Sequence, residues 1–451
     1  MPGDTNPNEG RLKAGRLVRV RAFAAADRGM AMAHHEGKIV FIPFAAPGDF
    51  LEVELLRERR RYLEGRIVRL LEPSAGRREA PCPHFGICGG CQWQHLPYAD
   101  QLQAKAASFR GFLRTRAGVA SDRVLPPIPS PQEWGYRNRV AWKVRHVGDE
   151  VLLGYFAAKS HRIVPIRTCP IALPSLQETL EPLRCFLKSF APARSALPQV
   201  DLQVDGRGGR WAVFHLLREL NSAEEGAVRS FAAERGLSGA CVQAGRKHTL
   251  AGLSAGPVRM PFSVGAGERT LSLQVTVGGF VQANQRVNQL LVDEVVRLAP
   301  LYGGCDVLDL YCGAGNFTLP LACVASLVVG VEGYPPAAED ARASAEANGF
   351  DNVRVLAAPA GRAAGELAAD GFRPRFALLD PPREGAEEAL PPLAALGPEW
   401  ILYVSCSPPT LARDLGILGG FGYRVEWARA ADMFPQTAHT EALVLLRRSN
   451  Q

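Results

Sequence analysis

The chain has 451 residues, of which 47% are hydrophobic and 22% charged, and its formal net charge is +7 with an isoelectric point near 8.9. This length exceeds what one hydrophobic core accommodates, so two to three folded domains are expected. No apolar run approaches the roughly twenty residues that a membrane span requires, and residues 1–17 are polar. We therefore expect a cytoplasmic protein without a membrane segment.

Residues 16–71 consist of short segments in which apolar and polar residues alternate. The four clearest segments are 17–22, 38–42, 50–55 and 63–70, separated by turn residues. This pattern predicts a small antiparallel barrel of four or five strands, which we place at residues 10–72. Barrels of this type commonly bind oligonucleotides. A predicted hairpin supplies cationic side chains and one stacking surface, from Arg57, Arg59, Arg60, Arg61 and Tyr62. The alternative is a solvated hairpin tip.

Ten cysteines are many for a cytosolic protein, where clustered cysteines more often bind metal than form disulfides. Three lie within one proline- and glycine-rich segment and a fourth follows much later: Cys82, Cys88, Cys91 and Cys169. Four thiolates can close a tetrahedral soft-metal site, and both zinc and an iron–sulfur cluster fit that number. Three clustered cysteines with a remote one that precedes proline favour a [4Fe-4S] cluster. With all four ligands present, the expected role is structural.

Residues 73–275 are predicted to form a central α+β domain that carries this cluster. Helical spacing over residues 98–114 indicates a helix that packs on the following domain. Strand-like segments at 140–145 and 151–156 follow, with a second basic group at Arg137, Arg139, Lys143 and Arg145. Clustered cations of this kind favour a polyanionic partner such as nucleic acid. Cys185 and Cys241 have no evident partners, and we expect both to be core residues.

Residues 276–451 read as alternating strands and helices, which predicts an α/β, Rossmann-like domain. A strand at 306–311 leads into the turn Cys312-Gly-Ala-Gly315 and a helix at 316–324. A second strand, at 327–331, ends in Glu332, 23 positions after Asp309. In this arrangement glycines let the backbone approach a nucleoside and an acid accepts from its ribose hydroxyls. The missing third glycine favours S-adenosylmethionine over NAD.

The stretch 400–410 contains five apolar residues bounded by turn residues, which predicts a buried strand. Cys406 then lies at its carboxyl end, where open α/β sheets bind ligands and where a thiol is placed to act as a nucleophile. The alternative is an inert core cysteine, which is the commoner case for a free thiol. Three further motifs, at 308–317, 379–383 and 434–441, favour the nucleophile.

Together these motifs resemble the RNA uridine-5-methyltransferase family, and in particular its 23S ribosomal RNA branch. The resemblance covers nearly the whole chain, with a TRAM-like barrel at 10–72, the four-cysteine cluster and a methyltransferase domain at 276–451. The motifs that carry it are Phe280-x-Gln282-x-Asn284, Asp309-x-Tyr311-Cys-Gly-Ala-Gly315-Asn316-Phe317, Asp380-Pro-Pro-Arg383, Ser405-Cys406-Ser-Pro408 and Phe434-Pro-x-Thr-x-His439-x-Glu441.

The resemblance implies methyl transfer from S-adenosylmethionine to carbon 5 of a specific uridine in 23S ribosomal RNA. Cys406 would be the nucleophile and Glu441 the general base, and the enzyme is expected to be a monomer. The residues that it places around cofactor and target base are Gln282, Tyr311, Gly313, Gly315, Asn316, Glu332 and Asp380. Two departures stand out. Ser407 replaces a usual asparagine, and residues 357–360, Ala-Ala-Pro-Ala, replace a stretch that usually contacts the adenine through Asp or Asn.

The chemistry accounts for these residue types. Carbon 5 of uracil is a poor nucleophile, so a thiolate must first add to carbon 6 and create an enolate. The adduct then carries a proton on carbon 5 that a nearby carboxylate must remove before the thiol leaves. Asp380 and Gln282 suit the polar edge of the base and the enolate. Without their motifs, Glu441 and Asp380 read as surface carboxylates or helix caps.

Two alternatives stay open on the sequence. A transfer-RNA uridine methyltransferase would use the same chemistry, although the bacterial tRNA enzymes of the family lack both barrel and cluster. A non-catalytic RNA-binding protein that keeps these folds is the second, and intact Cys406 and Glu441 speak against it.

Overall fold

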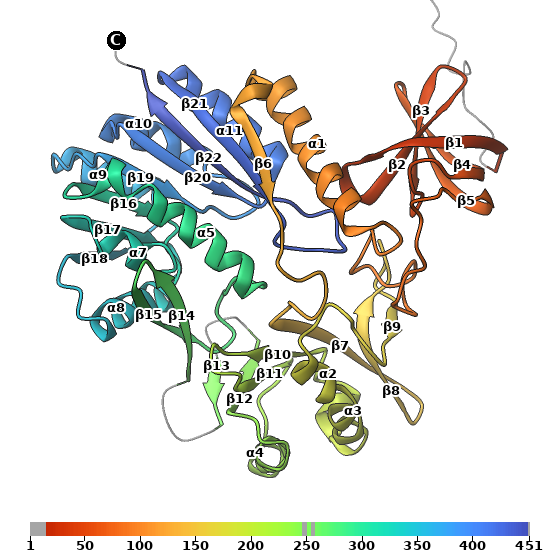
Figure 1. Cartoon of the computed structure of the whole chain (residues 1–451). Coiled ribbons are helices and arrows are strands. Elements are labelled where there is room, and N and C mark those ends of the chain that lie inside the picture. The colour runs from red at the N-terminus through yellow and green to blue at the C-terminus, as the bar shows by residue number, and fades with distance from the viewer. Residues whose placement is uncertain (1–14, 246–249, 254–257, 450–451) are drawn as a thin grey trace, which may run out of the picture. The chain divides into compact units, whose positions relative to one another are not determined.

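The computed structural model describes residues 15–245, 250–253 and 258–449, so the first residues of the predicted barrel, 10–14, and the last two of the chain lie outside the described residues. The chain divides into two compact units. The N-terminal unit comprises residues up to 108 together with 436–438, and the C-terminal unit comprises 109–435 and 439–451. Figure 1 labels their elements. No helix within the described ranges combines the length and apolar character needed to cross a membrane.

The N-terminal unit contains a closed five-stranded barrel in the order β1-β2-β3-β5-β4. Its strands are β1 (Leu17–Ala26), β2 (Met30–His35), β3 (Lys38–Pro43), β4 (Phe50–Glu58) and β5 (Tyr62–Glu72). Alternate residues point inward, so Val18, Val20, Leu51 and Val53 pack in its core. The predicted barrel is confirmed, but it is not wholly antiparallel as predicted, because β3 and β5 pair in parallel and the other neighbours pair antiparallel. The four segments recognised in the sequence are β1, β3, β4 and β5, and β2 is the fifth strand.

A turn-rich segment with Cys82, Cys88 and Cys91 follows β5 and leads into helix α1 (Tyr98–Ala117). This helix confirms the one predicted at 98–114. Its later residues Phe109 and Leu113 belong to the C-terminal unit, where they pack in the same apolar core as Leu310 and Tyr403.

The C-terminal unit contains a seven-stranded sheet in the order β13-β12-β11-β10-β7-β8-β9. Its strands are β7 (Arg139–Val147), β8 (Glu150–Phe156), β9 (Ile163–Pro165), β10 (Gln199–Val204), β11 (Arg210–Leu216), β12 (Gly239–Ala244) and β13 (Leu250–Gly252). The helices that belong to this region are α2 (Pro174–Glu178), α3 (Leu180–Ser189) and α4 (Ser222–Glu234). Apolar residues of α3 and α4 share one core with alternate residues of β7, β10 and β11.

The two cysteines Cys185 and Cys241 of this region differ in their exposure to solvent. Cys241 on β12 is fully buried, as expected, whereas Cys185 is exposed on α3. The expectation of a core position for Cys185 was wrong, because the apolar stripe of α3 consists of Leu180, Leu183 and Leu187 and Cys185 lies off that stripe.

A second sheet of eight strands has the order β18-β17-β16-β19-β20-β22-β21-β6. Apart from β6, its strands follow in the chain the hairpin of β14 (Arg259–Ala266) and β15 (Arg269–Thr276). Its strands are β6 (Val124–Ile128), β16 (Asp306–Leu310), β17 (Leu327–Glu332), β18 (Val353–Ala357), β19 (Phe376–Leu379), β20 (Trp400–Ser405), β21 (Tyr423–Ala431) and β22 (Glu441–Arg448). The central strands are continuous runs of buried residues, as in sheets covered on both faces.

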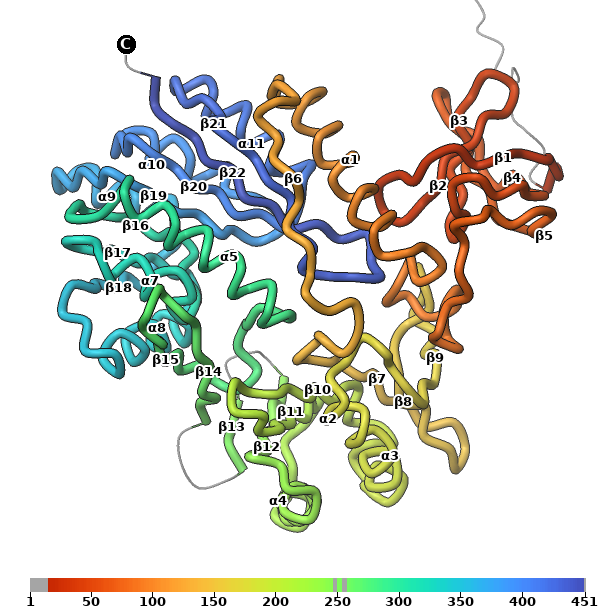
Figure 2. The backbone as a smooth tube through the Cα atoms, viewed as in Figure 1, coloured from red at the N-terminus to blue at the C-terminus, as the bar shows by residue number. Residues whose placement is uncertain are grey.

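Seven helices accompany this sheet: α5 (Gln285–Arg297), α6 (Ala299–Tyr302), α7 (Thr318–Ala322), α8 (Pro335–Ala347), α9 (Ala360–Ala369), α10 (Leu390–Leu396) and α11 (Pro408–Gly420). The path in Figure 2 shows the alternation of strand and helix that the sequence predicted. The helix expected at 316–324 is shorter, beginning at Thr318. Strand β6 precedes the strands of the seven-stranded sheet in the chain, but it pairs in parallel with β21 at the edge of the eight-stranded sheet.

Candidate active site

Four parallel strands of the second sheet end at one level, and this brings the predicted site residues together. Leu310 of β16 pairs with Val331 of β17 and with Leu379 of β19, and Leu379 pairs with Tyr403 of β20. The residues that follow these strand ends therefore lie along one edge. They are Tyr311, Glu332, Asp380 and, three residues beyond the last pairing, Cys406. This is the edge at which open α/β sheets bind their ligands.

Cys406 and Glu441 adjoin the last pair of two antiparallel strands. The pairs of β20 and β22 run from Trp400 with Arg447 to Ser405 with Ala442, and Cys406 and Glu441 are the residues next to this last pair. Their side chains interact electrostatically. Cys406 is half-buried, and Glu441, the first residue of β22, has 4% of its surface exposed. The sheet thus places a thiol beside a buried carboxyl.

The acid–base character of this pair follows from burial and from its charged neighbours. The pKa of the Cys406 thiol is raised to about 11, chiefly by burial and also by the carboxylates of Glu441 and Asp380, while Arg383 partly offsets these effects by charge and a hydrogen bond to the thiol. Burial, with a contribution from Asp380, also raises the pKa of Glu441. Burial alone raises the pKa of Asp380 to about 7. Three interacting groups with raised pKa values at a strand end are typical of catalytic sites.

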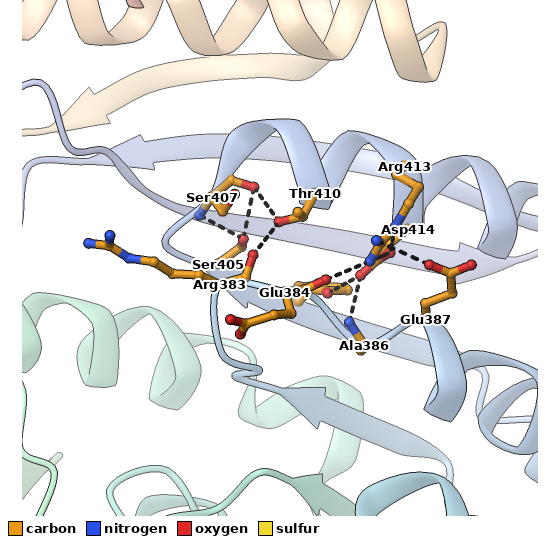
Figure 3. Close-up of polar contacts among 10 residues, drawn as sticks. Arg383, Glu384, Ala386, Glu387, Ser405, Ser407, Thr410, Arg413 and Asp414 are labelled. Carbon is orange, nitrogen blue, oxygen red and sulfur yellow. Dashed lines mark hydrogen bonds and ion pairs between the residues drawn. The ribbon is translucent and has the colours of Figure 1, made fainter. Parts of the chain in front are cut away.

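The turn that carries Cys406 is held by hydroxyl groups on both sides of it. The Ser407 N–H donates to Ser405 Oγ at 3.1 Å, and Thr410 Oγ1 bonds the Ser407 carbonyl at 3.0 Å and the Arg383 carbonyl at 3.1 Å. Figure 3 shows this network, with the Arg383 side chain extending away from Thr410. The backbone after β19 is thereby tied to the start of α11. Serine at 407, where the family usually has asparagine, takes part through its backbone only.

The predicted nucleoside turn has the backbone geometry that such a turn requires. Gly313 and Gly315 have φ angles of 56° and 97°, and Tyr311 has 64°, a left-handed conformation that is uncommon outside glycine. Glu332 accepts from the Gly313 N–H at 3.0 Å and from the Tyr334 N–H at 2.7 Å. Its carboxylate is thus oriented by two backbone donors, and each oxygen keeps lone pairs for further hydrogen bonds.

Asn316 is paired with a residue of α5. Its side-chain amide forms two reciprocal hydrogen bonds with Asn288 of α5, at 2.8 and 2.9 Å. The Asn284 side chain caps α5 by accepting from the Val287 N–H at 3.2 Å, and Gln282 lies two residues earlier, its carbonyl bonded by the Asn138 amide at 3.0 Å. The motif around Gln282 is therefore connected to the nucleoside turn through the first turns of α5.

Comparisons with known proteins identify the family. A family model described as tRNA (Uracil-5-)-methyltransferase matches residues 97–449, and a TRAM domain model matches residues 12–68. The chain belongs to the tRNA (Uracil-5-)-methyltransferase family. It is therefore an enzyme of the (uracil-5-)-methyltransferase class, as the motifs predicted.

Curated relatives match over nearly the full length. The 23S rRNA (uracil(1939)-C(5))-methyltransferase RlmD of Alkalilimnicola ehrlichii is 38% identical over 432 residues, which are 94% of this chain and 95% of the relative. RlmD of Nitrosococcus oceani is 36% identical over 434 residues, 95% of each chain. The structure of the Pyrococcus abyssi tRNA (uracil-54, C5)-methyltransferase with S-adenosyl-L-homocysteine has a TM-score of 0.70 at 24% identity, covering 95% of this chain and 100% of that one. That structure shares the fold.

The four cysteines of the predicted cluster are divided between the two units. Cys82, Cys88 and Cys91 belong to the N-terminal unit and Cys169 to the C-terminal unit, and all four are partly exposed. The Cys82 N–H donates to Gln94 Oε1 at 3.2 Å, and the Cys88 N–H donates to the His84 carbonyl at 2.9 Å. In the described part of the chain, no group of three or more His, Cys, Asp or Glu side chains is placed as a metal site.

The two basic groups found in the sequence differ in the structure. Arg57, Arg59, Arg60 and Arg61 are exposed around the turn between β4 and β5 and, among the residues that the structure describes, form no ion pair. In the second group, Arg139 is matched by Asp201 at 2.8 Å and donates to the Gly279 carbonyl. The hairpin tip is therefore the better candidate for contact with a polyanion.

Residues 357–360 occupy the end of β18 and the start of α9. Ala357 and Pro359 are exposed there, and Ala358 donates its N–H to the Glu332 carbonyl at 3.0 Å.

Sequence reasoning assigned no role to Arg383 or Asn288. Arg383 is the last residue of the Asp-Pro-Pro-Arg motif, but the motif alone does not indicate its role. The structure places it beside the Cys406 thiol. Asn288 lies outside every recognised motif, and only its pairing with Asn316 reveals it.

Proposed function

We propose that this enzyme transfers a methyl group from S-adenosylmethionine to carbon 5 of a uridine in 23S ribosomal RNA, through a covalent bond between Cys406 and the base. The observation that supports it most is the strand pairing that brings Cys406 beside the buried Glu441, next to Asp380 and the nucleoside turn. The proposal of 23S ribosomal RNA as the substrate rests on the relatives named RlmD.

In the first step the Cys406 thiolate adds to carbon 6 of the uracil, and the electron pair of the carbon 5–carbon 6 double bond moves into an enolate. Because the pKa of Cys406 is raised to about 11, few thiolates are present at neutral pH, and the thiol proton must go to a nearby base. Arg383 favours the thiolate through its charge and hydrogen bond. S-adenosylmethionine, when bound, supplies the electrophilic methyl group for carbon 5.

In the second half of the reaction a carboxylate takes the proton from carbon 5, the double bond re-forms and the Cys406 thiolate leaves. Glu441 is the candidate, since its raised pKa makes its carboxylate a stronger base than an ordinary one. Asp380, with a pKa near 7, can donate or accept a hydrogen bond at the polar edge of the base at neutral pH. Gln282 supplies an amide for the same edge.

The nucleoside turn is proposed to hold the methyl donor. Gly313 and Gly315 allow close approach of the backbone, Glu332 offers carboxylate oxygens to the ribose, and Tyr311 lies at the end of β16 beside Asp380. Asn316 contributes through the position of the turn, because its amide is engaged by Asn288.

A second candidate substrate is transfer RNA, favoured by the description of the family model and by the fold shared with the Pyrococcus abyssi enzyme. Mapping of 5-methyluridine in ribosomal and transfer RNA from a strain that lacks the gene distinguishes the two. We expect one or more 23S sites to lose the modification and transfer RNA to keep it. Loss confined to transfer RNA would assign the substrate to the alternative.

A [4Fe-4S] cluster on Cys82, Cys88, Cys91 and Cys169 is proposed from the donor set, since four thiolates with this spacing suit soft iron. We expect the anaerobically purified protein to be brown, with about four irons per chain. Cys82→Ser should lower iron content and thermal stability without changing the chemical step of the folded fraction, because a closed site offers no open coordination position. The exposed Cys185→Ser is the matched control and should keep its iron. Stoichiometric zinc without iron would contradict the cluster.

RNA binding is proposed to involve the exposed tip of the β4–β5 hairpin. Replacing Arg59, Arg60 and Arg61 together by alanine should weaken RNA binding about tenfold at low salt and reduce the slope of log affinity against log salt by about 2, because phosphate contacts release counterions. The control replaces Arg16, Arg21 and Arg66, which are already paired with glutamates of the barrel. Filter binding at several salt concentrations measures both. Equal losses in the two triple variants would remove the hairpin tip from the interface.

A further inference from the structure

Three residues of the C-terminal sequence, 436–438, belong to the N-terminal unit, although their neighbours on both sides belong to the C-terminal unit. Glu441, the proposed base, follows Ala438 by three residues. The contacts that hold residues 436–438 therefore act on the backbone that leads into Glu441.

The central contact is between two fully buried glutamines, Gln101 of α1 and Gln436. The Gln436 N–H donates to Gln101 Oε1 at 2.8 Å, and Gln101 Nε2 donates to Gln436 Oε1 at 2.9 Å. The Gln436 carbonyl accepts from the N–H groups of Gln92 and Trp93, each at 3.0 Å. Arg78 adds a hydrogen bond to Gln436 Oε1 at 3.2 Å. The backbone donor and acceptor of Gln436 are thus both satisfied inside the N-terminal unit.

Gln101 also fixes the segment from which these donors come. Its Nε2 lies within hydrogen-bond distance of the Trp93 and Leu96 carbonyls, at 3.1 and 2.9 Å. The Gln92 side chain contacts the last of residues 436–438, because its Oε1 accepts from the Ala438 N–H at 3.3 Å. Gly29 of the barrel permits this approach, since a side chain there would meet Gln92 Cβ at 2.3 Å.

Gln436 itself has a φ of 70°, in the left-handed region that non-glycine residues avoid unless their surroundings enforce it. On the other side of it, the Tyr136 hydroxyl donates to the Pro435 carbonyl at 2.9 Å, and both of those residues belong to the C-terminal unit. Glu441 is paired with Ala431 at the start of β22. The chain from Pro435 to Glu441 is therefore held at several points, with Gln436 the strained one.

We propose that Gln101 is a positioning residue for the base Glu441, acting through Gln436 and the four residues, 437–440, that connect it to Glu441. This proposal rests on the function proposed above. A displacement of about 1 Å in a reacting group can cost roughly a hundredfold in rate, so loss of the Gln101 amide should impair the step that uses Glu441 and leave the addition of Cys406 largely intact. Cys406 lies between β20 and α11, and neither of these elements has a residue in the N-terminal unit.

The test is Gln101→Leu in the full-length enzyme, with single-turnover measurements of two rates. One is the appearance of labelled methyl in the covalent enzyme–RNA adduct, and the other is the release of methylated RNA from it. We expect methyl transfer to stay within about threefold of wild type and release to slow by about tenfold or more, so that adduct accumulates on a denaturing gel, on the scale that general-base catalysis allows.

The matched control is Asp49→Asn. Asp49 is a buried barrel residue that bonds the Ala46 and Ser74 N–H groups and Arg77, and these contacts include none of residues 436–438. General destabilisation of the N-terminal unit should lower both rates in parallel in this variant. A parallel fall of both rates in Gln101→Leu, or unchanged release, would overturn the proposal.

A second variant covers the case in which Gln101→Leu does not fold. Gln436→Gly keeps the backbone bonds and relieves the left-handed strain but loses the side-chain bonds to Gln101 and Arg78, so release should slow by about threefold with methyl transfer unchanged. If neither variant separates the two rates, Gln101 does not position the base. Failure of the wild-type enzyme to form any adduct would instead reject the proposed function itself.

Discussion

Cys406→Ala is expected to abolish both methylation and the covalent enzyme–RNA adduct. Without the thiol no bond forms at carbon 6, so the enolate does not form and carbon 5 is not nucleophilic enough to attack the methyl group. The rate should fall by at least about 10⁴-fold, the scale on which loss of a covalent nucleophile acts in other enzymes. A denaturing gel with labelled RNA and S-adenosylmethionine reads the adduct, and methyl incorporation reads the rate.

The structure offers a matched control for this variant. Cys305 precedes the first residue of β16, at the opposite end of that strand from Tyr311, and Cys305→Ala should retain both adduct and turnover. Cys312 of the nucleoside turn is a second cysteine of this domain; it is buried, with 5% of its surface exposed, and burial raises its pKa. If Cys406→Ala kept the adduct, another cysteine would be the nucleophile, and Cys312 would be tested next.

Local patterns predicted much of this fold because they depend on neighbouring residues. The alternation of apolar and polar residues predicted four of the barrel strands. A run of apolar residues predicted β20, with Cys406 just beyond its end. The glycine turn after β16 and the acid that ends β17 were placed correctly, since strand, turn and strand follow each other in the chain. Family membership then followed from motifs at several such strand ends.

Pairings between distant segments could not be read in the same way. Strand β6 contains Pro126 and Pro127 and joins the second sheet as its edge strand, where missing backbone donors are tolerated. Nothing in its local sequence indicates β21 as its partner. Charge counting likewise could not show that Arg139 is matched by Asp201, whereas the hairpin tip is not matched. The exchange of amide bonds between Asn288 and Asn316 is a tertiary contact of the same kind.

The same limit applies to the candidate site. Cys406 and Glu441 were proposed from motifs, but their proximity, the buried state of Glu441 and the hydrogen bond from Arg383 to the thiol required the sheet. The division of the motif 434–441 between two units has no signature in the sequence, because Gln436 is an ordinary polar residue there. Its buried contacts with Gln101 alone distinguish it.

Glu441→Gln is expected to trap the enzyme on its RNA. Addition of Cys406 and methyl transfer do not need the carboxylate to accept the carbon 5 proton, but release does, so turnover should fall by about 10²–10⁴-fold while the adduct accumulates. The adduct should carry labelled methyl, in contrast to Cys406→Ala, which should form none. Normal turnover would show that another base or a water takes the proton.

Stability measurements separate this effect from misfolding. Burial raises the pKa of Glu441 in the folded state, so the stability that its protonated form provides is fully present below the unfolded value near 4.5 and is lost as the pH rises through the folded value. Glutamine stays neutral throughout. The melting temperature of Glu441→Gln should therefore equal or exceed that of the wild type, with the difference growing from about pH 5 upward through neutral pH. A lower melting temperature at neutral pH would mean that the carboxylate is stabilised in the fold, and accumulation of adduct could then no longer be assigned to the loss of a base alone.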